Sequence, residues 1–288
     1  MPRRRPKVPK SPRRQPTPAT TQPLPPTPTP PPPEKRREQI LTDFATLRIP
    51  VMAAQLDAAL EQAQKEGLSH LEFLHRLLAD QAGLRRQRSL QRRIEDAGFR
   101  ELKPLTEFDW NFNPSIPRVQ IEALATADFV RRGQNVVFVG QSGLGKSCLI
   151  QALGYAACVH GHRVYYITSG ELLEDLTASL ADQTLHQRIR FYAKFDLLIL
   201  DEFGFDRIER SLAPQAASLW YKVIDARNQR VSTALVTNID FEAWADYLGD
   251  APLAMAFLDR VVHGATIVKL KGQSYRLGQA GKKMPEKG

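Results

Sequence analysis

Residues 138–147, FVGQSGLGKS, constrain the fold of this chain more than any other stretch. Within them, Gly140, Gly145, Lys146 and Ser147 match the pattern G-x-x-x-x-G-K-[ST]. An apolar run precedes the loop and a helical pattern follows it, which is the context that a phosphate-binding loop requires. Backbone N–H groups and the N-terminus of such a helix point at phosphate oxygens. The pattern predicts a nucleotide-binding α/β domain; the alternative is a chance loop of glycines.

The chemistry of this loop predicts which residues contact the nucleotide. Lys146 is expected to reach the β- and γ-phosphates, and the Ser147 hydroxyl is expected to bind Mg²⁺. The remaining contacts are expected from the loop and the start of the helix. The predicted nucleotide-binding residues here are Gly140, Gln141, Ser142, Gly143, Leu144, Gly145, Lys146, Ser147 and Cys148.

A second signature lies about 55 residues further on, where the apolar run LLIL ends in Asp201 and Glu202. Ligands of α/β sheets bind at the carboxyl ends of the strands, so these carboxylates are expected to face the nucleotide. Asp201 is expected to hold Mg²⁺, and Glu202 to polarise the attacking water; a solvated turn is the alternative. The guanine-binding pattern N-K-x-D is absent, because residues 237–240 are TNID. Adenine is therefore the expected base.

Two further polar residues follow apolar segments and are candidates for hydrolysis. Asn238 ends the apolar run TALVTN, where an amide could hold the attacking water. The alternative is that Asn238 caps the next helix. Arg260 follows a short apolar helix and could stabilise charge on the γ-phosphate in the transition state. The alternative for Arg260 is an ion pair with Asp259 or another acid.

The second half of the chain alternates apolar runs with helical patterns. Four runs are expected to be buried strands: NVVFVG, RVYYIT, DLLILDE and STALVTN. Helices are expected between them, the first ending near Gly161 and the second capped by Ser169. Continuous apolar strands that alternate with helices indicate a parallel sheet covered on both faces.

The first 33 residues have a composition unlike the rest. They contain 14 of the 21 prolines and seven Lys or Arg residues, with no Asp or Glu. The net charge of +9 is therefore mostly a property of this segment. Such a segment cannot bury enough apolar surface to fold, so a polyproline-like disordered tail is expected. Its cations could contact a nucleic acid or an acidic membrane surface, or simply keep the chain in solution.

Residues 39–103 are expected to be helical. Pro50 suits a first helical position and Gly67 can end that helix. Ser69 and Glu72 form a predicted capping box before a second helix. The apolar residues that follow the box are Leu71, Phe73, Leu74, Leu77 and Leu78.

The second helix becomes basic toward its end. Arg85, Arg88 and Arg92 are spaced to share one face, which would suit DNA phosphates. The alternative is a solvated face, partly neutralised by Glu95 and Asp96. The candidate DNA-binding residues are Arg85, Arg86, Arg88, Arg92 and Arg93.

Cysteine usage and hydropathy bear on the compartment. Cys148 and Cys158 lie ten apart on one predicted helix, too distant to form a disulfide. No apolar run approaches the roughly 18 residues of a membrane span, and no apolar segment follows the basic N-terminus as in a secretory signal. A reduced, cytoplasmic setting without membrane contact is expected.

Taken together, GQSGLGKS, LLILDEFG, TNI, FLDR and KGQSYR resemble the IstB-type transposition ATPases of bacterial insertion sequences. These are relatives of the DnaC helicase loaders in the AAA+ superfamily. The resemblance covers roughly residues 40–280 and includes the stretch before the phosphate-binding loop. It implies a P-loop AAA+ core with a small N-terminal all-helical domain.

The resemblance also implies roles for single residues. Lys146 and Ser147 look like the Walker A pair, Asp201 and Glu202 like Walker B, and Asn238 like sensor 1. Arg260 looks like an arginine finger that enters the neighbouring subunit's site. Phe108 and Trp110 match the family's run near the adenine, and Arg276 could act as a second sensor. Because only 28 residues follow Arg260, a full C-terminal helical lid is not expected.

The implied protein has three parts: a tail (1–38), a helical domain (39–105) and an ATPase domain (106–288). It would bind ATP and Mg²⁺, hydrolyse ATP in a homo-oligomer with shared ATP sites, and assemble on double-stranded DNA. Its partner would be an IstA-type transposase in a bacterial cytoplasm. Two alternatives stay open: a DnaC-like replicative helicase loader, and an ATP-gated DNA-binding scaffold with incidental hydrolysis.

Overall fold

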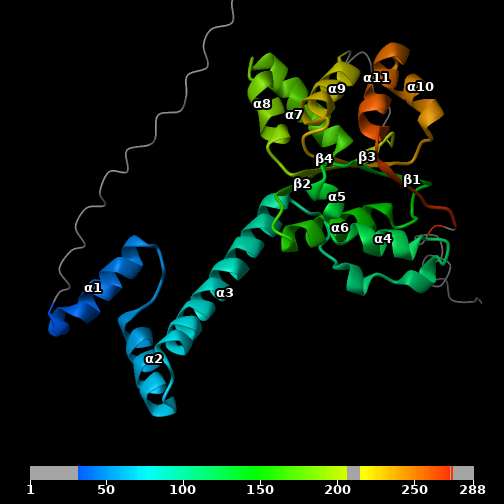
Figure 1. Ribbon diagram of the computed structural model, residues 1–288. Helices are drawn as coiled ribbons and strands as arrows, with labels where there is room; N and C mark the ends of the chain where they lie inside the picture. The colour runs from blue at the N-terminus through cyan, green and yellow to red at the C-terminus, as the bar shows by residue number, and fades with distance from the viewer. Residues whose placement is uncertain (1–31, 206–214, 273, 275–288) are drawn as a thin grey trace, which may run out of the picture. The chain divides into compact units, whose positions relative to one another are not determined.

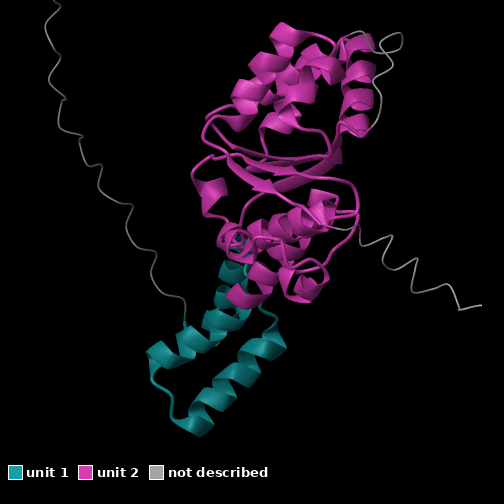
Figure 2. Ribbon diagram, turned by 90° about the vertical axis from the view of Figure 1, so that its right-hand side faces the viewer, with its two compact units in different colours: residues 1–81 teal, residues 82–288 magenta. Residues whose placement is uncertain are grey.

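The chain forms two compact units. The computed structural model describes residues 32–205, 215–272 and 274 (Figure 1). The units are Met1–Gln81 and Ala82–Gly288 (Figure 2). Most of the predicted tail lies outside the described residues. Helix α1, Pro33–Thr46, begins within residues 1–38, the predicted tail. Its first residue is a proline, which is well tolerated at the start of a helix.

Helix α3, His70–Ala97, belongs to both units. The division falls between residues 81 and 82, whereas the sequence placed a boundary at 105. The reason is packing: Leu90, Ile94 and Ala97 contact the core of the larger unit. The second half of α3 is thus part of the folded body that contains the phosphate-binding loop.

The smaller unit contains α1, α2 (Ala53–Glu66) and the start of α3. Gly67 ends α2 with a left-handed φ of 63°, as expected, but α2 begins at Ala53 rather than at Pro50. The predicted capping box is present, since Glu72 accepts hydrogen bonds from both the backbone N–H and the hydroxyl of Ser69.

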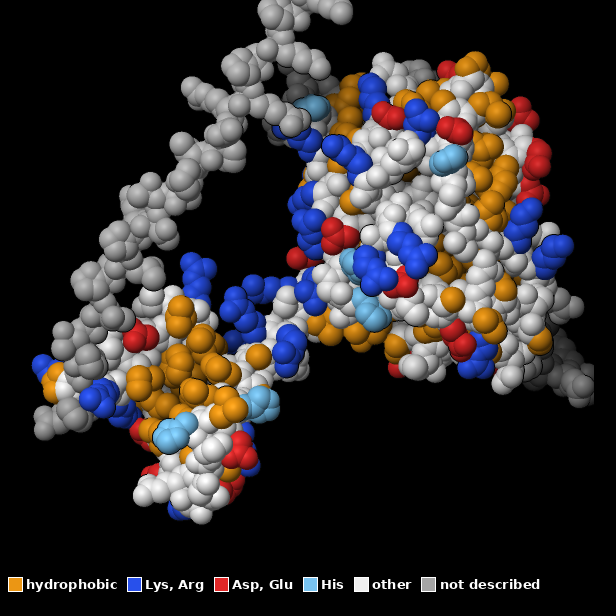
Figure 3. Space-filling view, in the orientation of Figure 1, with side chains coloured by type: hydrophobic (Ala, Val, Ile, Leu, Met, Phe, Trp, Pro, Cys, Tyr) orange, Lys and Arg blue, Asp and Glu red, His pale blue; other side chains and the backbone are white. Residues whose placement is uncertain are grey.

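The apolar residues at the start of α3 are only partly covered. Leu77 is buried, as is Leu56 of α2. Leu71, Leu74 and Leu78 are exposed, and hydrophobic side chains gather on this unit in Figure 3. The predicted apolar face therefore exists, but a single layer of neighbouring helices buries little of it.

The larger unit is built on a parallel sheet, as predicted. The strand order is β2-β3-β4-β1-β5, with every described pair of neighbours parallel. The strand β5 was not expected from the sequence, because it is a short edge strand with only one fully buried residue, Val268. The strands are β1 (Val136–Val139), β2 (Val164–Thr168), β3 (Leu197–Phe203), β4 (Ser232–Thr237) and β5 (Thr266–Lys269).

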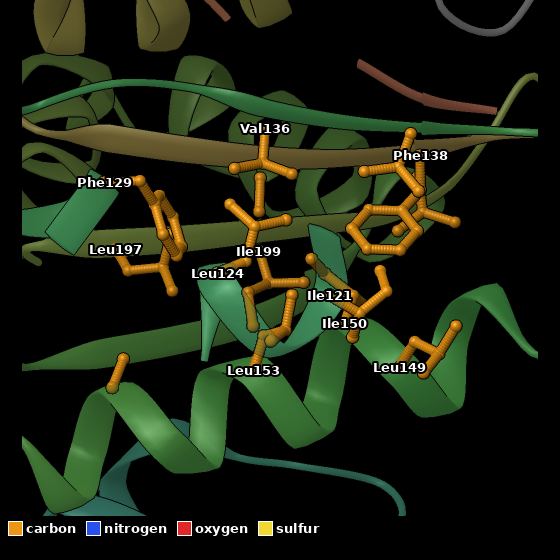
Figure 4. Packing of buried hydrophobic residues seen from close by; sticks show 14 of the residues in the cluster. Ile121, Leu124, Phe129, Val136, Phe138, Leu149, Ile150, Leu153, Leu197 and Ile199 are labelled. Carbon is orange, nitrogen blue, oxygen red and sulfur yellow. The ribbon is translucent and has the colours of Figure 1, made fainter. Parts of the chain in front are cut away.

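Helices cover both faces of this sheet (Figure 1). On one side, residues of α4, α5 and α6 pack against alternate side chains of β1 and β3 (Figure 4). The opposite face is covered by α7 to α11. None of the described helices is long and apolar enough to cross a membrane. The helices are α4 (Arg118–Leu124), α5 (Asp128–Arg131), α6 (Lys146–Val159), α7 (Ser169–Ala181), α8 (Leu185–Ala193), α9 (Ala216–Arg227), α10 (Trp244–Leu248) and α11 (Ala251–Val262).

Two helix ends in this unit differ in detail from the expectation. Helix α6 ends at Val159, two residues before Gly161. Helix α7 begins at Ser169, and its N-cap is Thr168, whose hydroxyl accepts from the backbone N–H of Glu171. Thr168 and Ser169 both have the hydroxyl of a capping residue, so the local sequence does not discriminate between them.

A buried arginine joins helices and strands on the α8–α9 side. The guanidinium of Arg227 donates hydrogen bonds to the Thr233 hydroxyl and to the backbone oxygens of Tyr192, Phe195 and Ser232. Arg227 is fully buried, and burial lowers its pKa from the usual value. Removing the arginine would take a donor from each of these four oxygens.

We expect Arg227→Met to destabilise the larger unit by about 3 kcal/mol, because several buried acceptors lose their donor. Urea unfolding followed by tryptophan fluorescence measures this change. The matched control is Arg230→Met, since Arg230 lies three residues away but is exposed. Equal stability of the two variants would show that the buried hydrogen bonds contribute nothing net.

Candidate functional site

The phosphate-binding loop connects β1 to α6, as predicted. Gly140 donates its N–H to the backbone oxygen of Thr237 at 3.2 Å, so the loop starts beside the end of β4. Gly145 has a φ of 86° and lies immediately before α6. A Cβ at Gly145 would lie 3.4 Å from the ring of Phe108, an ordinary contact distance, so the left-handed φ and not a lack of space favours glycine here.

Lys146 is the first residue of α6 and is held inside the loop. Its Nζ donates to the backbone oxygens of Gly140 and Gln141 at 2.6 and 2.7 Å. Burial lowers the pKa of Lys146, and the charge of Asp201 acts in the opposite direction. Lys146 and Asp201 line the same cavity, although the two residues are far apart in sequence.

Asp201 is buried at the end of β3 and is held on both carboxylate oxygens. One accepts from the hydroxyl of Tyr166 at 2.9 Å, and the other accepts from the backbone N–H of Glu202 at 2.8 Å. Burial, together with Asp201, raises the pKa of Tyr166, so the phenol remains a donor. Sequence analysis missed Tyr166, because the register between β2 and β3 is not visible in either strand alone.

Ser147 and Asp201 both line the cavity beside the loop. A hydroxyl and a carboxylate are hard oxygen donors, the type that Mg²⁺ prefers, so the donor set fits this ion. The described residues contain no group of three or more His, Cys, Asp and Glu placed to hold a metal. Such a group is not required here, since Mg²⁺ in nucleotide sites keeps water and phosphate ligands.

Glu202 and Asn238 come from the ends of the neighbouring strands β3 and β4 and line the same cavity. The register between these strands shifts between Leu200 and Phe203, and Glu202 has a left-handed φ of 60°. A non-glycine residue in this region is strained, and such strain is concentrated at functional sites. The side-chain nitrogen of Asn238, in the orientation that satisfies its hydrogen bonds, donates to the backbone oxygens of Phe203 and Gly204 at 3.3 and 3.1 Å.

A cavity of about 360 Å³ opens between these elements, a size typical of sites for small ligands. Phe108 lines it, and so does Phe112, which the sequence analysis did not identify; a contact of Phe108 with adenine stays a prediction. Trp110 packs edge-to-face on Phe108 at 4.9 Å and does not line the described cavity. The other lining residues are Glu101, Lys103, Glu107, Asp109, Ser142, Gly143, Gly145, Lys146, Ser147, Cys148, Asp201, Glu202, Phe205, Val236, Thr237 and Asn238.

Three of the predicted loop residues do not line the described cavity: Gly140, Gln141 and Leu144. Leu144 is buried in the core, and Gln141 offers its backbone oxygen to Lys146. Cys148 is partly buried at the cavity, while Cys158 is fully buried; both are free thiols, as expected.

Arg260 does not line the cavity. Its guanidinium pairs with Asp225 at 3.1 Å and with Asp259 at 3.0 Å, so the ion pair considered as an alternative is present. All three side chains are partly exposed, and exposed ion pairs are weak enough to exchange partners. Arg276 lies outside the described residues.

The basic face of α3 is displayed by the larger unit. Arg85, Arg86, Arg88 and Arg92 are exposed. Arg93 is partly buried and donates to the backbone oxygen of Cys158 at 3.0 Å. Arg93 therefore attaches α3 to α6. The spacing of arginines in the sequence could not distinguish this structural role from a contact with DNA.

The fold and the site define the class of protein. A glycine-rich loop between β1 and α6, a buried acid at the end of β3 and a cavity at the carboxyl ends of the parallel strands are the features of an α/β nucleotide-binding protein of the P-loop type. The chain belongs to the family of IstB-like ATP binding proteins, which matches residues 42–283.

Its relatives include ATP-binding proteins of bacterial insertion sequences. The protein of IS232 from Bacillus thuringiensis subsp. berliner is 35% identical over 83% of this chain and 94% of its own length. The proteins of IS5376 from Geobacillus stearothermophilus and IS21 from Pseudomonas aeruginosa are each 34% identical over 80% of this chain, covering 90% and 86% of their own lengths.

Among solved structures, DnaI is 20% identical with a TM-score of 0.48, covering 58% of this chain and 90% of that chain. The DnaC helicase loader is 17% identical with a TM-score of 0.46, covering 62% of this chain and 99% of that chain.

Proposed function

We propose that this chain is a Mg²⁺-dependent ATPase that binds duplex DNA and assists an insertion-sequence transposase of the IstA type. One observation carries the proposal: Lys146, Ser147, Asp201, Glu202 and Asn238 come from three separate parts of the chain and line one cavity. The relatives from insertion sequences favour transposition over the loading of a replicative helicase.

In the proposed reaction, Lys146 pairs with the β- and γ-phosphates of ATP. Ser147 and Asp201 would hold Mg²⁺, which would neutralise phosphate charge when bound. Glu202 accepts a proton from water while the water oxygen bonds to the γ-phosphorus and the bond to the ADP oxygen breaks. Asn238 orients this water. Tyr166 keeps the Asp201 carboxylate turned toward the cavity through its hydrogen bond.

The proposed active form is a homo-oligomer with shared ATP sites in the bacterial cytoplasm. Arg260 is exposed enough to leave its acids and enter a neighbour's site, where its charge would stabilise the transition state. Among the described residues that line the cavity the cations are Lys103 and Lys146, with no arginine, so an arginine from a neighbour would supply a guanidinium that this lining lacks. This cation would make hydrolysis depend on assembly.

Duplex DNA is proposed to bind on the exposed arginines of α3. Replacing Arg85, Arg88 and Arg92 by Gln should reduce the slope of log K against log salt by about 2.7, at about 0.9 for each lost phosphate contact. Fluorescence anisotropy with ATP present measures the slope. Chains lacking residues 1–31 are used, because the cations of this segment would hide the change.

The matched control for this experiment replaces Arg131 and Arg132, which are also exposed on the larger unit but pair with Asp128. Their slope should stay close to that of the unsubstituted chain. An unchanged slope in the α3 variant would assign its arginines to a solvated helix face. The ATPase rate with and without duplex DNA then tests whether DNA stimulates hydrolysis.

A further inference from the structure

The segment that follows α3 is anchored to the phosphate-binding helix. The backbone N–H groups of Arg100 and Glu101 both donate to Gln151 Oε1, at 2.9 and 3.0 Å. Gln151 is buried on α6, and its nitrogen donates to the backbone oxygen of Ser147 at 3.1 Å. The backbone of Arg100 is therefore fixed in position. Gln151 links it by hydrogen bonds to Ser147, the last residue of the loop motif that is proposed to bind phosphate.

The segment is also packed tightly from its other side. A Cβ at Gly154 of α6 would lie 2.8 Å from the ring of Phe99, so the glycine allows this ring to lie directly on the helix. The adjoining end of α3 is held by Arg93 on the Cys158 oxygen. With its backbone fixed on both sides, Arg100 can direct its guanidinium only toward a limited region.

That region contains two carboxylates. Arg100 Nη2 donates to Glu171 Oε1 at 2.7 Å, and Nη1 lies 3.7 Å from Glu202 Oε2. The hydrogen bond to Glu171 is the main cause of the raised pKa of Arg100, to which Glu202 adds. The guanidinium is thus a single cation shared between a helix-capping acid and the acid proposed to activate water.

We propose that Arg100 is a positioning residue that restrains Glu202 and slows ATP hydrolysis. A carboxylate oxygen that pairs with a guanidinium is less available to accept a proton from the attacking water. Glu171 competes for the same cation, so the balance between Glu171 and Glu202 sets how strongly Glu202 is held. This inference rests on the proposed function, which assigns water activation to Glu202.

The competition predicts opposite effects from two substitutions in the full chain. Arg100→Met should raise kcat by about two- to fivefold, the range expected for loss of a partly exposed ion pair. Glu171→Gln should lower kcat, because Arg100 then pairs with Glu202 alone. Glutamine at this position still completes the capping box with Thr168, so the start of α7 is preserved.

The double variant Arg100→Met/Glu171→Gln should behave like Arg100→Met, since without the cation there is nothing to share. Arg100→Lys keeps the charge and should stay within about twofold of the unsubstituted chain. The affinity for a fluorescent ATP analogue should be the same in all variants. A merely structural role for Arg100 would lower kcat in both single variants and would not be rescued by Lys.

Steady-state hydrolysis at saturating ATP gives kcat for each variant. A fall of kcat in Arg100→Met, a rise in Glu171→Gln, or no change in either would overturn the inference. Failure of the proposed function is seen separately in Glu202→Gln: if this variant hydrolyses ATP at the full rate, Glu202 does not activate water. In the Glu202→Gln background, Arg100→Met should have no effect.

Discussion

Lys146→Ala is expected to weaken ATP binding by about 10- to 150-fold, the effect of losing one hydrogen bond to a charged group. The amine is enclosed by the loop, with Asp201 as its neighbouring charge, so no other described side chain of the loop replaces it at the phosphate end of the cavity. Titration with a fluorescent ATP analogue measures the change.

Lys146→Met is the matched control for this prediction. Methionine keeps much of the buried stem and removes only the charge, so its affinity should fall as far as that of the alanine variant. If the methionine variant binds ATP normally, the lysine acts by filling space and not by pairing with phosphate. Normal affinity in both variants would reject the nucleotide site at the loop.

Arg260→Ala is expected to reduce hydrolysis strongly while leaving ATP affinity unchanged. Arginine fingers contribute about 10³–10⁵ in rate where they act in GTPases. Because Arg260 does not line its own cavity, its effect should depend on contact between subunits. The rate of the unsubstituted chain should therefore rise faster than linearly with protein concentration.

Mixing variants tests whether the arginine acts between subunits. Arg260→Ala keeps an intact cavity, whereas Lys146→Ala keeps an intact Arg260. In an equal mixture about one quarter of head-to-tail interfaces would combine an intact arginine with an intact cavity, so part of the activity should return. Co-sedimentation of the two variants is the control for assembly.

If a co-assembled mixture stays as inactive as either variant alone, Arg260 does not act on a neighbour. Its ion pairs with Asp225 and Asp259 would then be its role, as a link between α9 and α11. A double substitution of these two acids should leave hydrolysis intact under the proposal. If the ion pairs themselves are required for hydrolysis, the double substitution should lower the rate as much as Arg260→Ala does.

The sequence by itself determined four of the five described strands, the glycine-rich loop and the acids at the end of β3. These features depend on short-range patterns: a continuous apolar run buries as a strand, and a glycine-rich turn before a helix exposes N–H groups to phosphate. The predicted residues Lys146, Ser147, Asp201, Glu202 and Asn238 do line one cavity. Parallel strands bring their carboxyl ends to the same edge, so this meeting follows from strand type alone.

Only the tertiary structure decided which side chains serve these residues. Tyr166 on Asp201, Phe112 in the cavity wall and Arg100 between two acids depend on strand register and on how α3 packs against α6. The structure divides the chain into compact units between residues 81 and 82, inside α3, and it shows that Arg93 donates to the Cys158 oxygen of α6; a DNA contact of Arg93 stays a prediction. Contacts between segments far apart in sequence leave no pattern in the sequence of either segment. Each side chain fits its own helix or strand equally well with or without the distant partner.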